Sequence, residues 1–151
     1  MRRRVHFVLV LLAWLPVVAA LAAQDRPNVP APPHLVAEIQ QTLDAAIRRF
    51  DAMDGAGVLV YVSEAYRTGP LTKAGLAEQL RVIFAIHDRV KARVRIDEVR
   101  MVGEHAWVYS TGEVSGRLRL LGGWIVVMSW ERELEVARRE DGRWRLYGYQ
   151  Q

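Results

Sequence analysis

The C-terminal stretch from Trp124 to Gln151 constrains the fold of this chain most strongly. It contains two strand-like runs joined by a turn at Asp141-Gly142, and three of the five tryptophans. From Trp124 to Val136 the even-numbered positions are apolar except Arg132, whereas the odd-numbered positions from Ser129 onward are polar or acidic. Such alternation indicates strands with one face against a core. We therefore expect the even positions to face inward and the acidic positions, Glu131, Glu133 and Glu135, to face outward.

The turn between the two runs decides which of their residues pair. A two-residue Asp-Gly loop would place Trp144 and Leu146 beside Glu135 and Arg139. A three-residue loop pairs Val136 with Leu146 and Arg138 with Trp144, and it puts Gln150 opposite Arg132. Burying a large aromatic side chain is worth roughly 4–6 kcal/mol as an upper figure, against about 1 kcal/mol for a turn preference. We therefore predict the three-residue, bulged turn.

Two amphipathic helices precede the strands. The first opens at Pro33 and carries one apolar stripe from Leu35 to Phe50. The second follows a Thr72 N-cap, and its stripe ends at His87. Between them, the short apolar run Val58–Val62 suits a buried strand or a helical turn equally well.

The alternation from Val90 to Met101 predicts a long strand. Its apolar parity flips after Ile96, which indicates a β-bulge near Asp97-Glu98. A tight turn at Gly103-Glu104 then returns the chain and pairs Val99 with Val108 and Met101 with Ala106. Residues 115–123 suit a loop or a hairpin tip; the tip is apolar and basic, which suits contact with a partner or a membrane, but we favour a strand extension.

The N-terminal 23 residues have the features of a secretory signal peptide. Arg2–Arg4 precede an apolar run, and Ala20-Leu21-Ala22 provides a small-residue cleavage site. An uncleaved membrane anchor is the alternative, because the run is nearly long enough to span a bilayer. Residues 24–33 contain four prolines and are expected to be a linker, so we predict one folded domain over residues 34–151 in the periplasm or outside the cell.

Composition excludes several classes of function. From Gln24 onward there are 18 basic and 17 acidic side chains, which gives no basic surface for nucleic acid. The chain has no cysteine, so thiolate metal sites, disulfides and cysteine nucleophiles are excluded. The four histidines lack metal-ligand spacing, and we expect neither a metal nor a cofactor. We expect membrane contact only through the signal peptide.

Three segments resemble the nuclear transport factor 2-like superfamily, in particular its polyketide cyclase-like (SnoaL-like) and ketosteroid isomerase-like groups. They are Phe50 with Asp54-Gly55, the stretch Gly103–Val108, and Arg139–Leu146. The resemblance covers residues 34–150. It implies an α+β fold in which a strongly bent, mainly antiparallel sheet of about four long strands wraps around the N-terminal helices. It also implies a conical pocket between sheet and helices, and homodimers formed through the convex face.

Combined with the predicted faces, the resemblance suggests a set of ligand-binding residues. These are Arg132, Gln150, Trp124, Trp130, Tyr61, Tyr66 and His87, with Ser110, Met128 and Phe84 beside them. Each also has a plainer interpretation. Arg132 suits an ion pair at the sheet edge, the tryptophans suit core packing, and His87 suits a hydrogen bond to a backbone carbonyl.

Two functions are compatible with this picture. The first is a binding module for a small apolar or anionic ligand, without chemistry of its own. The alternative is an enzyme of the ketosteroid isomerase or polyketide cyclase type, an isomerase, dehydratase or cyclase, which needs a carboxylate base in the cone. We favour the first, because no inner carboxylate is predicted. On the outer face, Trp107, Tyr109, Tyr147 and Tyr149 predict a homodimer interface.

Overall fold

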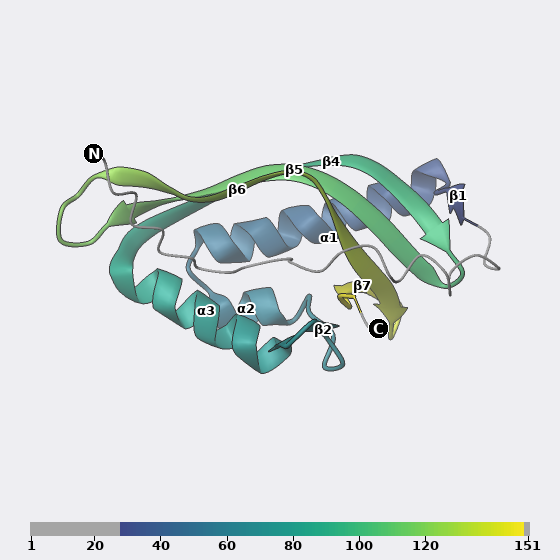
Figure 1. Cartoon of the computed structure of the whole chain (residues 1–151), viewed down its shortest axis with the longest axis horizontal. Coiled ribbons are helices and arrows are strands. Elements are labelled where there is room, and N and C mark those ends of the chain that lie inside the picture. The colour runs from purple at the N-terminus through teal and green to yellow at the C-terminus, as the bar shows by residue number, and fades with distance from the viewer. Residues whose placement is uncertain (1–27, 150–151) are drawn as a thin grey trace, which may run out of the picture.

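The computed structural model describes residues 28–149 and has the predicted α+β architecture. The expected signal peptide, residues 24–27 of the linker and Gln150 lie outside the described residues. An antiparallel five-stranded sheet with the order β1-β4-β5-β6-β7 arches over three helices (Figure 1). Its strands are β1 (Asn28–Pro30), β4 (His87–Val102), β5 (His105–Leu118), β6 (Trp124–Glu140) and β7 (Arg143–Leu146). Strand β1, which pairs with β4, occupies part of the expected linker.

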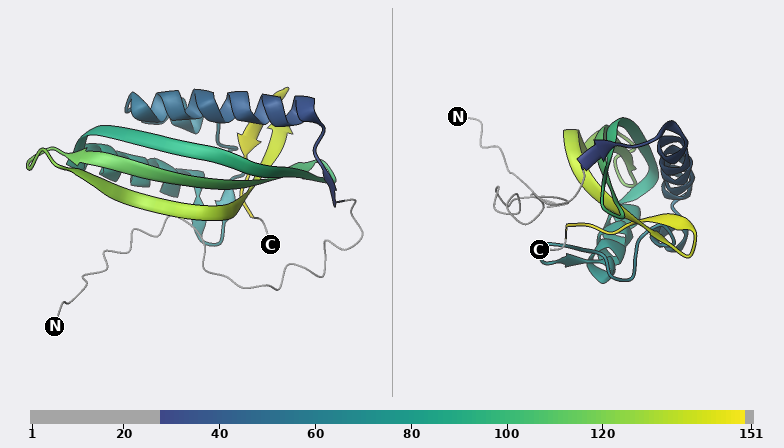
Figure 2. Two further views of the ribbon diagram at one scale, coloured as in Figure 1. Left: turned by 90° about the horizontal axis from the view of Figure 1, so that it is seen from above. Right: turned by 90° about the vertical axis from the view of Figure 1, so that its right-hand side faces the viewer.

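The helices lie beneath the arch of the sheet, and α1 follows its length (Figures 1 and 2). They are α1 (Pro33–Asp51), α2 (Gly55–Leu59) and α3 (Lys73–Ile86), and a small hairpin of β2 (Arg67–Thr68) and β3 (Leu71–Thr72) precedes α3. The predicted N-cap is confirmed, since the Thr72 hydroxyl accepts a hydrogen bond from the Gly75 amide at 3.3 Å. The run Val58–Val62 begins in α2, continues as a turn and ends with Val62 in an isolated parallel bridge to Leu146. Asp54 caps α2 by accepting from the Gly57 amide at 2.8 Å.

The core lies between α1 and the sheet, and its residues come from α1, β4, β5 and β7. Its buried side chains are Ile39 of α1, Val99 of β4, Ala106 and Val108 of β5, and Trp144 of β7. The predicted pairing of Val99 with Val108 and of Met101 with Ala106 is confirmed, as is the bulge between Ile96 and Glu98. These pairs define the inner face of the sheet, which on β5 consists of the even-numbered positions from Ala106 to Gly116.

A second bulge, which the sequence pattern did not reveal, reverses the faces of β6. Ser110 pairs with Glu133 and Gly112 pairs with Trp130, so that Glu131 and Arg132 both lie opposite Thr111. Arg132 occupies the left-handed backbone region with φ of 46°. Because one extra residue shifts the alternation, Trp130 and Glu133 lie on the same inner face. The prediction that the even positions stay inward throughout β6 is therefore wrong beyond Trp130. It is also wrong before Met128, because a further register shift at Val127 places Trp124 and Val126 opposite Arg117 and Ser115 of the outer face.

The predicted three-residue turn is also wrong, and for the same reason. Glu140 pairs with Arg143, Arg139 with Trp144 and Ala137 with Leu146, which leaves a two-residue Asp141-Gly142 loop. Both loop residues have positive φ, 50° and 75°, as this tight hairpin requires. Since the bulge has already turned the odd positions inward, the two-residue loop is the one that keeps Trp144 and Leu146 in the core.

Thr111 connects the two bulges. Its hydroxyl donates to Asp97 at 2.6 Å on β4 and accepts from the Arg132 amide at 3.0 Å on β6. The extra residue of each neighbouring strand is thus held by one side chain of β5. The hydrogen bond to Thr111 is the leading reason that the pKa of Asp97 lies below its usual value.

The backbone conformation of Arg132 gives a direct test of the β6 bulge. Left-handed geometry costs a residue with a Cβ about 1–2 kcal/mol, and a β-branched residue more. The Arg132 side chain contributes only an exposed ion pair, worth roughly 0–1 kcal/mol. We expect Arg132→Gly to be close to neutral and Arg132→Val to lower the free energy of unfolding by about 2 kcal/mol, as measured by urea denaturation. Equal stability of the two variants would contradict the bulge.

Candidate functional site

Two carboxyl groups, those of Glu133 and Glu135, extend from β6 on the inner face of the sheet. Glu135 pairs with Val108, a core residue packed near α1, and Glu133 pairs with Ser110, which is also buried. Directly paired residues share a face, so both glutamates lie on the helix side of the sheet. This overturns the expectation that the inner face carries no acid and that Glu133 and Glu135 face outward.

Burial alters the acidity of both groups. It raises the pKa of Glu133 above its usual value. For Glu135, burial and then repulsion from Glu133 raise the pKa to about 8. A carboxyl group in this range exchanges protons readily near neutral pH, which is the property that a general acid or base needs.

Two phenols have a pKa that the charge of Glu135 helps to raise, those of Tyr66 and Tyr149. Tyr66 is buried, and burial raises its pKa to about 12; a hydrogen bond with the Thr68 side chain lowers the pKa, and the charge of Glu135 raises it further. Its segment is fixed to β7: the Leu146 amide donates to the Tyr61 carbonyl at 2.8 Å and the Arg67 amide donates to the Tyr147 carbonyl at 3.2 Å. The phenol is therefore a neutral hydrogen-bond donor held on a rigid backbone at physiological pH.

Trp130 and Ser110 continue the row of polar groups on the inner face from Glu135 and Glu133 toward the middle of the sheet. The Trp130 indole Nε1 donates to the Ser110 hydroxyl at 3.1 Å. Gly112 makes this packing possible, since a Cβ there would lie 2.4 Å from the indole ring. The predicted inner placement of Trp130 is thus confirmed, and its ring lies beside the position from which Glu133 extends.

Arg132 does not face the cone. Its guanidinium donates to Glu98 at 2.5 Å and lies 5.1 Å from the centroid of the Tyr109 ring, on the outer face. The plainer interpretation, an ion pair with an acidic residue, is the one that the structure shows. The inner placement fails because the bulge lies at Arg132 itself.

The other predicted site residues do not form one pocket. His87 pairs with Leu118, ten positions along β5 from Val108, which is about 33 Å of strand at 3.3 Å per residue. It is 1% exposed, and its Nδ1 donates to the Ile83 carbonyl at 2.8 Å, as the plainer interpretation expects. Trp124 lies at that same distant end, opposite Arg117, and is exposed.

Two helix-side candidates also have packing roles. Tyr61 borders a shallow depression between α1 and β7, with Glu38 and Trp144. Phe84 of α3 packs against Phe50 of α1, with 5.5 Å between ring centroids and 51° between the ring planes. Of the predicted site residues that the structure describes, Ser110, Trp130 and Tyr66 are the ones that strand register, hydrogen bonding and electrostatics connect to the carboxyl pair.

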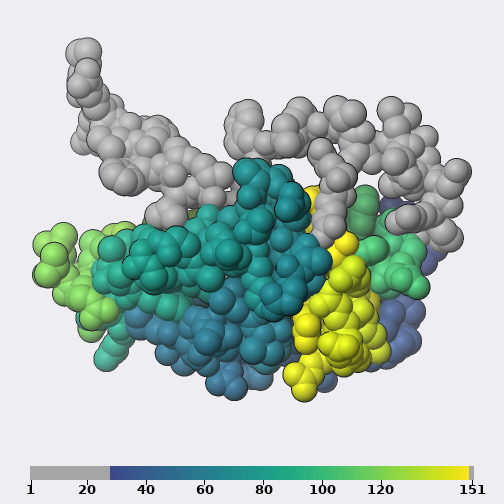
Figure 3. All heavy atoms as spheres, turned by 90° about the horizontal axis from the view of Figure 1, so that it is seen from below, coloured from purple at the N-terminus to yellow at the C-terminus, as the bar shows by residue number. Residues whose placement is uncertain are grey.

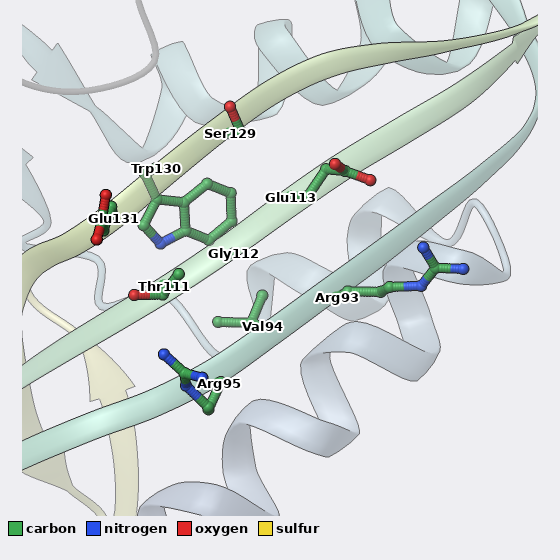
Figure 4. A pocket seen from close by; sticks show the side chains of 9 residues that line it. All are labelled: Arg93, Val94, Arg95, Thr111, Gly112, Glu113, Ser129, Trp130 and Glu131. Atoms are coloured by element: carbon green, nitrogen blue, oxygen red, sulfur yellow. The ribbon is translucent and has the colours of Figure 1, made fainter.

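A separate open groove of about 720 Å³ crosses the middle of the sheet (Figure 4). Its lining residues come from three adjacent strands, and Figure 4 shows two arginines of β4 on one side of Trp130 and Glu131 of β6 on the other. Six of the nine are odd-numbered residues of β4, β5 and the Ser129–Glu131 part of β6, where the odd positions point away from the helices. Within residues 28–149, no group of histidine and acidic side chains is arranged to hold a metal ion.

This arrangement of a bent antiparallel sheet over helices, with polar groups on the concave face, defines the nuclear transport factor 2-like fold. Solved structures confirm it. A conserved protein from Planctomyces limnophilus superposes with a TM-score of 0.67 at 12% identity, over 78% of this chain and 94% of that one. A ketosteroid isomerase-like protein from Erwinia carotovora atroseptica superposes with a TM-score of 0.60 at 20% identity, over 78% and 94% of the two chains.

A candidate dehydratase of the nuclear transport factor 2-like family from Streptomyces avermitilis gives the same TM-score, 0.60, at 14% identity, again over 78% of this chain and 94% of that one. No family model matches the sequence, and no curated protein sequence matches it. At these identities the likeness establishes the fold, and the activity has to be argued from the residues of this chain.

Proposed function

We propose that this chain is a proton-transfer enzyme of the isomerase or dehydratase type, with Glu135 as its acid–base group. The observation that supports this most is geometric: the bulge at Arg132 turns two carboxyl groups toward the helix side of the sheet. The case against catalysis rested on the absence of such a group. The resemblance to ketosteroid isomerase-like and dehydratase-like structures points in the same direction.

In this proposal the ligand is a small, largely apolar carbonyl compound. Ionised Glu135 removes a proton from the carbon next to the carbonyl, and the protonated carboxyl then returns it at another position or to a departing hydroxyl group. Tyr66, which keeps its proton, donates a hydrogen bond to the carbonyl oxygen as negative charge develops there. Neither step oxidises or reduces the ligand, so no redox cofactor is required.

The test measures proton exchange and binding separately. Candidate cyclic ketones and β-hydroxy carbonyl compounds are incubated with the protein in deuterium oxide, and deuterium uptake is followed by NMR. Glu135→Gln should lower the rate of exchange by a factor of about 100 or more, the usual contribution of a positioned acid–base group. Glu131→Gln, on the outward-facing side of the same strand, is the matched control. Exchange that survives in Glu135→Gln would contradict the proposal.

The second candidate is ligand binding without chemistry, the function that the sequence favours. Native mass spectrometry of the purified protein would detect a ligand that stays bound during isolation. A retained ligand, together with no deuterium exchange in the unaltered protein, would favour the binding module over the enzyme.

We also propose that the protein is exported and dimeric. The N-terminal pattern supports export to the periplasm, and the intact mass of protein from a periplasmic extract would report the cleavage. The outer face supports a dimer: Trp107 lies 6.2 Å from Tyr149 between ring centroids, and Tyr147 lies 5.2 Å from His105. Tyr109 lies on the same outer face.

Tyr149→Asp should convert the dimer to a monomer, because a charge at the centre of an aromatic interface is costly to bury. Sedimentation velocity measures the change. Thermal unfolding is the control, since Tyr149 also packs against Trp107 within one chain. An unchanged sedimentation coefficient in a folded variant would rule out this interface.

A further inference from the structure

The tip of the β5–β6 hairpin is the most exposed apolar segment of the described chain. Eight large hydrophobic side chains are exposed within residues 28–149, and five of them are Leu120, Leu121, Trp124, Ile125 and Val126. Leu120 and Leu121 are 96% and 81% exposed. The tip projects past the end of α3 and past the body of the protein (Figures 1 and 3). Single exposed leucines are common on protein surfaces, but a contiguous group on a projection marks a contact site.

The tip has a defined structure. The Leu118 amide donates to the Gly123 carbonyl at 2.9 Å and the Gly122 amide donates to the Leu118 carbonyl at 2.8 Å, which closes a tight turn. The Arg119 guanidinium donates to the carbonyls of Phe84, Ala85 and His87 at the C-terminal end of α3. Arg119 thereby ties the base of the turn to the helix and leaves the two leucines at the outermost position.

Charge complements this apolar end. The segment 114–130 contains two arginines and no acidic residue. Across the strands Arg89 pairs with Arg117, and Arg117 pairs with Trp124, so two cations and an indole share one row of the outer face. The next row places Lys91 opposite Ser115, and Ser115 opposite Val126. Arg117 and Lys91 are held by Asp88 and Asp51, whereas Arg89 forms no ion pair within residues 28–149.

The leucines lie at the projecting tip, and the indole and the cations lie on the strands that lead to it. This order matches the layers of a membrane surface. Acyl chains accept the leucines, the headgroup region accepts the indole, and anionic headgroups attract the arginines. A pocket on a protein partner would need only the exposed apolar side chains and would leave the cations and the indole without a role. We propose that the β5–β6 tip inserts Leu120 and Leu121 into the interface of an anionic lipid bilayer and so orients the domain on a membrane surface.

The test uses the full chain with one fluorescent label. Because the chain has no cysteine, Leu121→Cys labelled with an environment-sensitive fluorophore reports on the tip alone. Asp141→Cys, in the exposed turn at the other end of β6, is the matched control. Each protein is mixed with phosphatidylcholine vesicles, with or without phosphatidylglycerol, and with vesicles that carry a quencher in the acyl region.

The tip label should shift to the blue and be quenched with phosphatidylglycerol vesicles, and the label at position 141 should do neither. Adding Leu120→Asp should weaken the response of the tip label by roughly tenfold to a hundredfold, the contribution expected of one buried leucine. Arg89→Glu should weaken it on anionic vesicles and have little effect in high salt.

Three results would overturn the proposal. Vesicle binding with no shift at position 121 would mean that another part of the chain, such as the apolar N-terminal stretch, holds the lipid. A shift that depends on protein concentration without lipid would assign the tip to a second copy of the chain. No response at all would mean that the tip does not meet a membrane.

Discussion

Replacing Glu135 with glutamine should stabilise the protein at alkaline pH and change its stability little at pH 5. In the folded chain, burial and repulsion from Glu133 raise the pKa of Glu135 to about 8 from an ordinary 4.5. Below pH 4.5 the group is protonated whether the chain is folded or not. As the pH rises from 4.5 through 8, the unfolded chain loses this proton first, so the folded state is progressively disfavoured.

The size of the effect follows from the same two values. The gap between about 8 and 4.5 corresponds to at most about 5 kcal/mol at pH 9, since each tenfold change in acidity is worth about 1.4 kcal/mol. Solvent that reaches the partly buried carboxyl lowers this figure. Glutamine, which stays neutral at every pH, resembles the protonated carboxyl and avoids the loss.

Urea denaturation at pH 5 and at pH 9 measures the effect. The unaltered protein should lose stability between the two conditions, and Glu135→Gln should lose less. Glu131→Gln, which removes a carboxylate from the outward-facing side of the same strand, should follow the unaltered protein. The groups coupled electrostatically to Glu135 are Glu133, Tyr66 and Tyr149. The pKa of each tyrosine is raised to about 12, so of these three only Glu133 loses a proton below pH 9. Parallel curves for all three proteins would show that Glu135 is not buried.

The same residue links stability to the proposed activity. Buried carboxyl groups with a raised pKa concentrate in active sites, where their acidity is matched to proton transfer. Glu135→Gln can then be tested for both properties. A variant that is more stable at pH 9 and inactive in proton exchange would show that burial of the Glu135 carboxyl lowers the stability of the fold and supports the proposed activity.

The fold could be predicted because its signals were local. The stripe of α1, the Thr72 cap and the Gly103-Glu104 turn each follow from a few neighbouring residues. The bulge near Asp97 was also visible, because apolar residues change parity from Ile96 to Val99. Each of these patterns predicts its local structure without information from the rest of the chain.

The β6 bulge is not accompanied by a change of apolar parity in the sequence, because both faces of that part of the strand are covered. Leu134 and Val136 face outward, yet Val136 is buried: its carbonyl accepts from the amides of Tyr147 and Gly148. The C-terminal segment therefore covers an outer face that the sequence pattern presented as the inner one. Apolar residues continue at even positions through the bulge, and alternation alone cannot show that the face has changed.

One undetected residue determined the candidate site. Treating β6 as continuous placed Arg132 inside and Glu133 and Glu135 outside, and it then favoured the turn that kept Leu134 and Trp144 together. Thr111, which holds both bulges, was the available signal: a polar residue in the centre of β5 has to bond to its neighbours. Its partners, however, depend on the register and are not apparent from the sequence.

Replacing Trp144 with alanine should produce the largest loss of stability, because the two-residue turn places its ring in the core. Trp144 is 5% exposed, packs with Ile39 and Val108, and its Nε1 donates to Glu38 of α1 at 3.1 Å. Truncating a buried tryptophan typically lowers the free energy of unfolding by about 3–5 kcal/mol. For a domain of this size, that is a melting temperature lower by roughly 10–20 °C.

Trp144→Phe separates the ring from its hydrogen bond. It keeps most of the apolar contact and removes the donor to Glu38, which also accepts from Arg139, so an intermediate loss of roughly 1–3 kcal/mol is expected. Trp124→Ala is the matched control: that indole is 54% exposed at the hairpin tip, and its loss should change stability by no more than about 0.5 kcal/mol. Calorimetry of the three variants decides between the registers. A three-residue turn would pair Trp144 with Arg138 on the outer face, where its truncation would cost little more than that of Trp124.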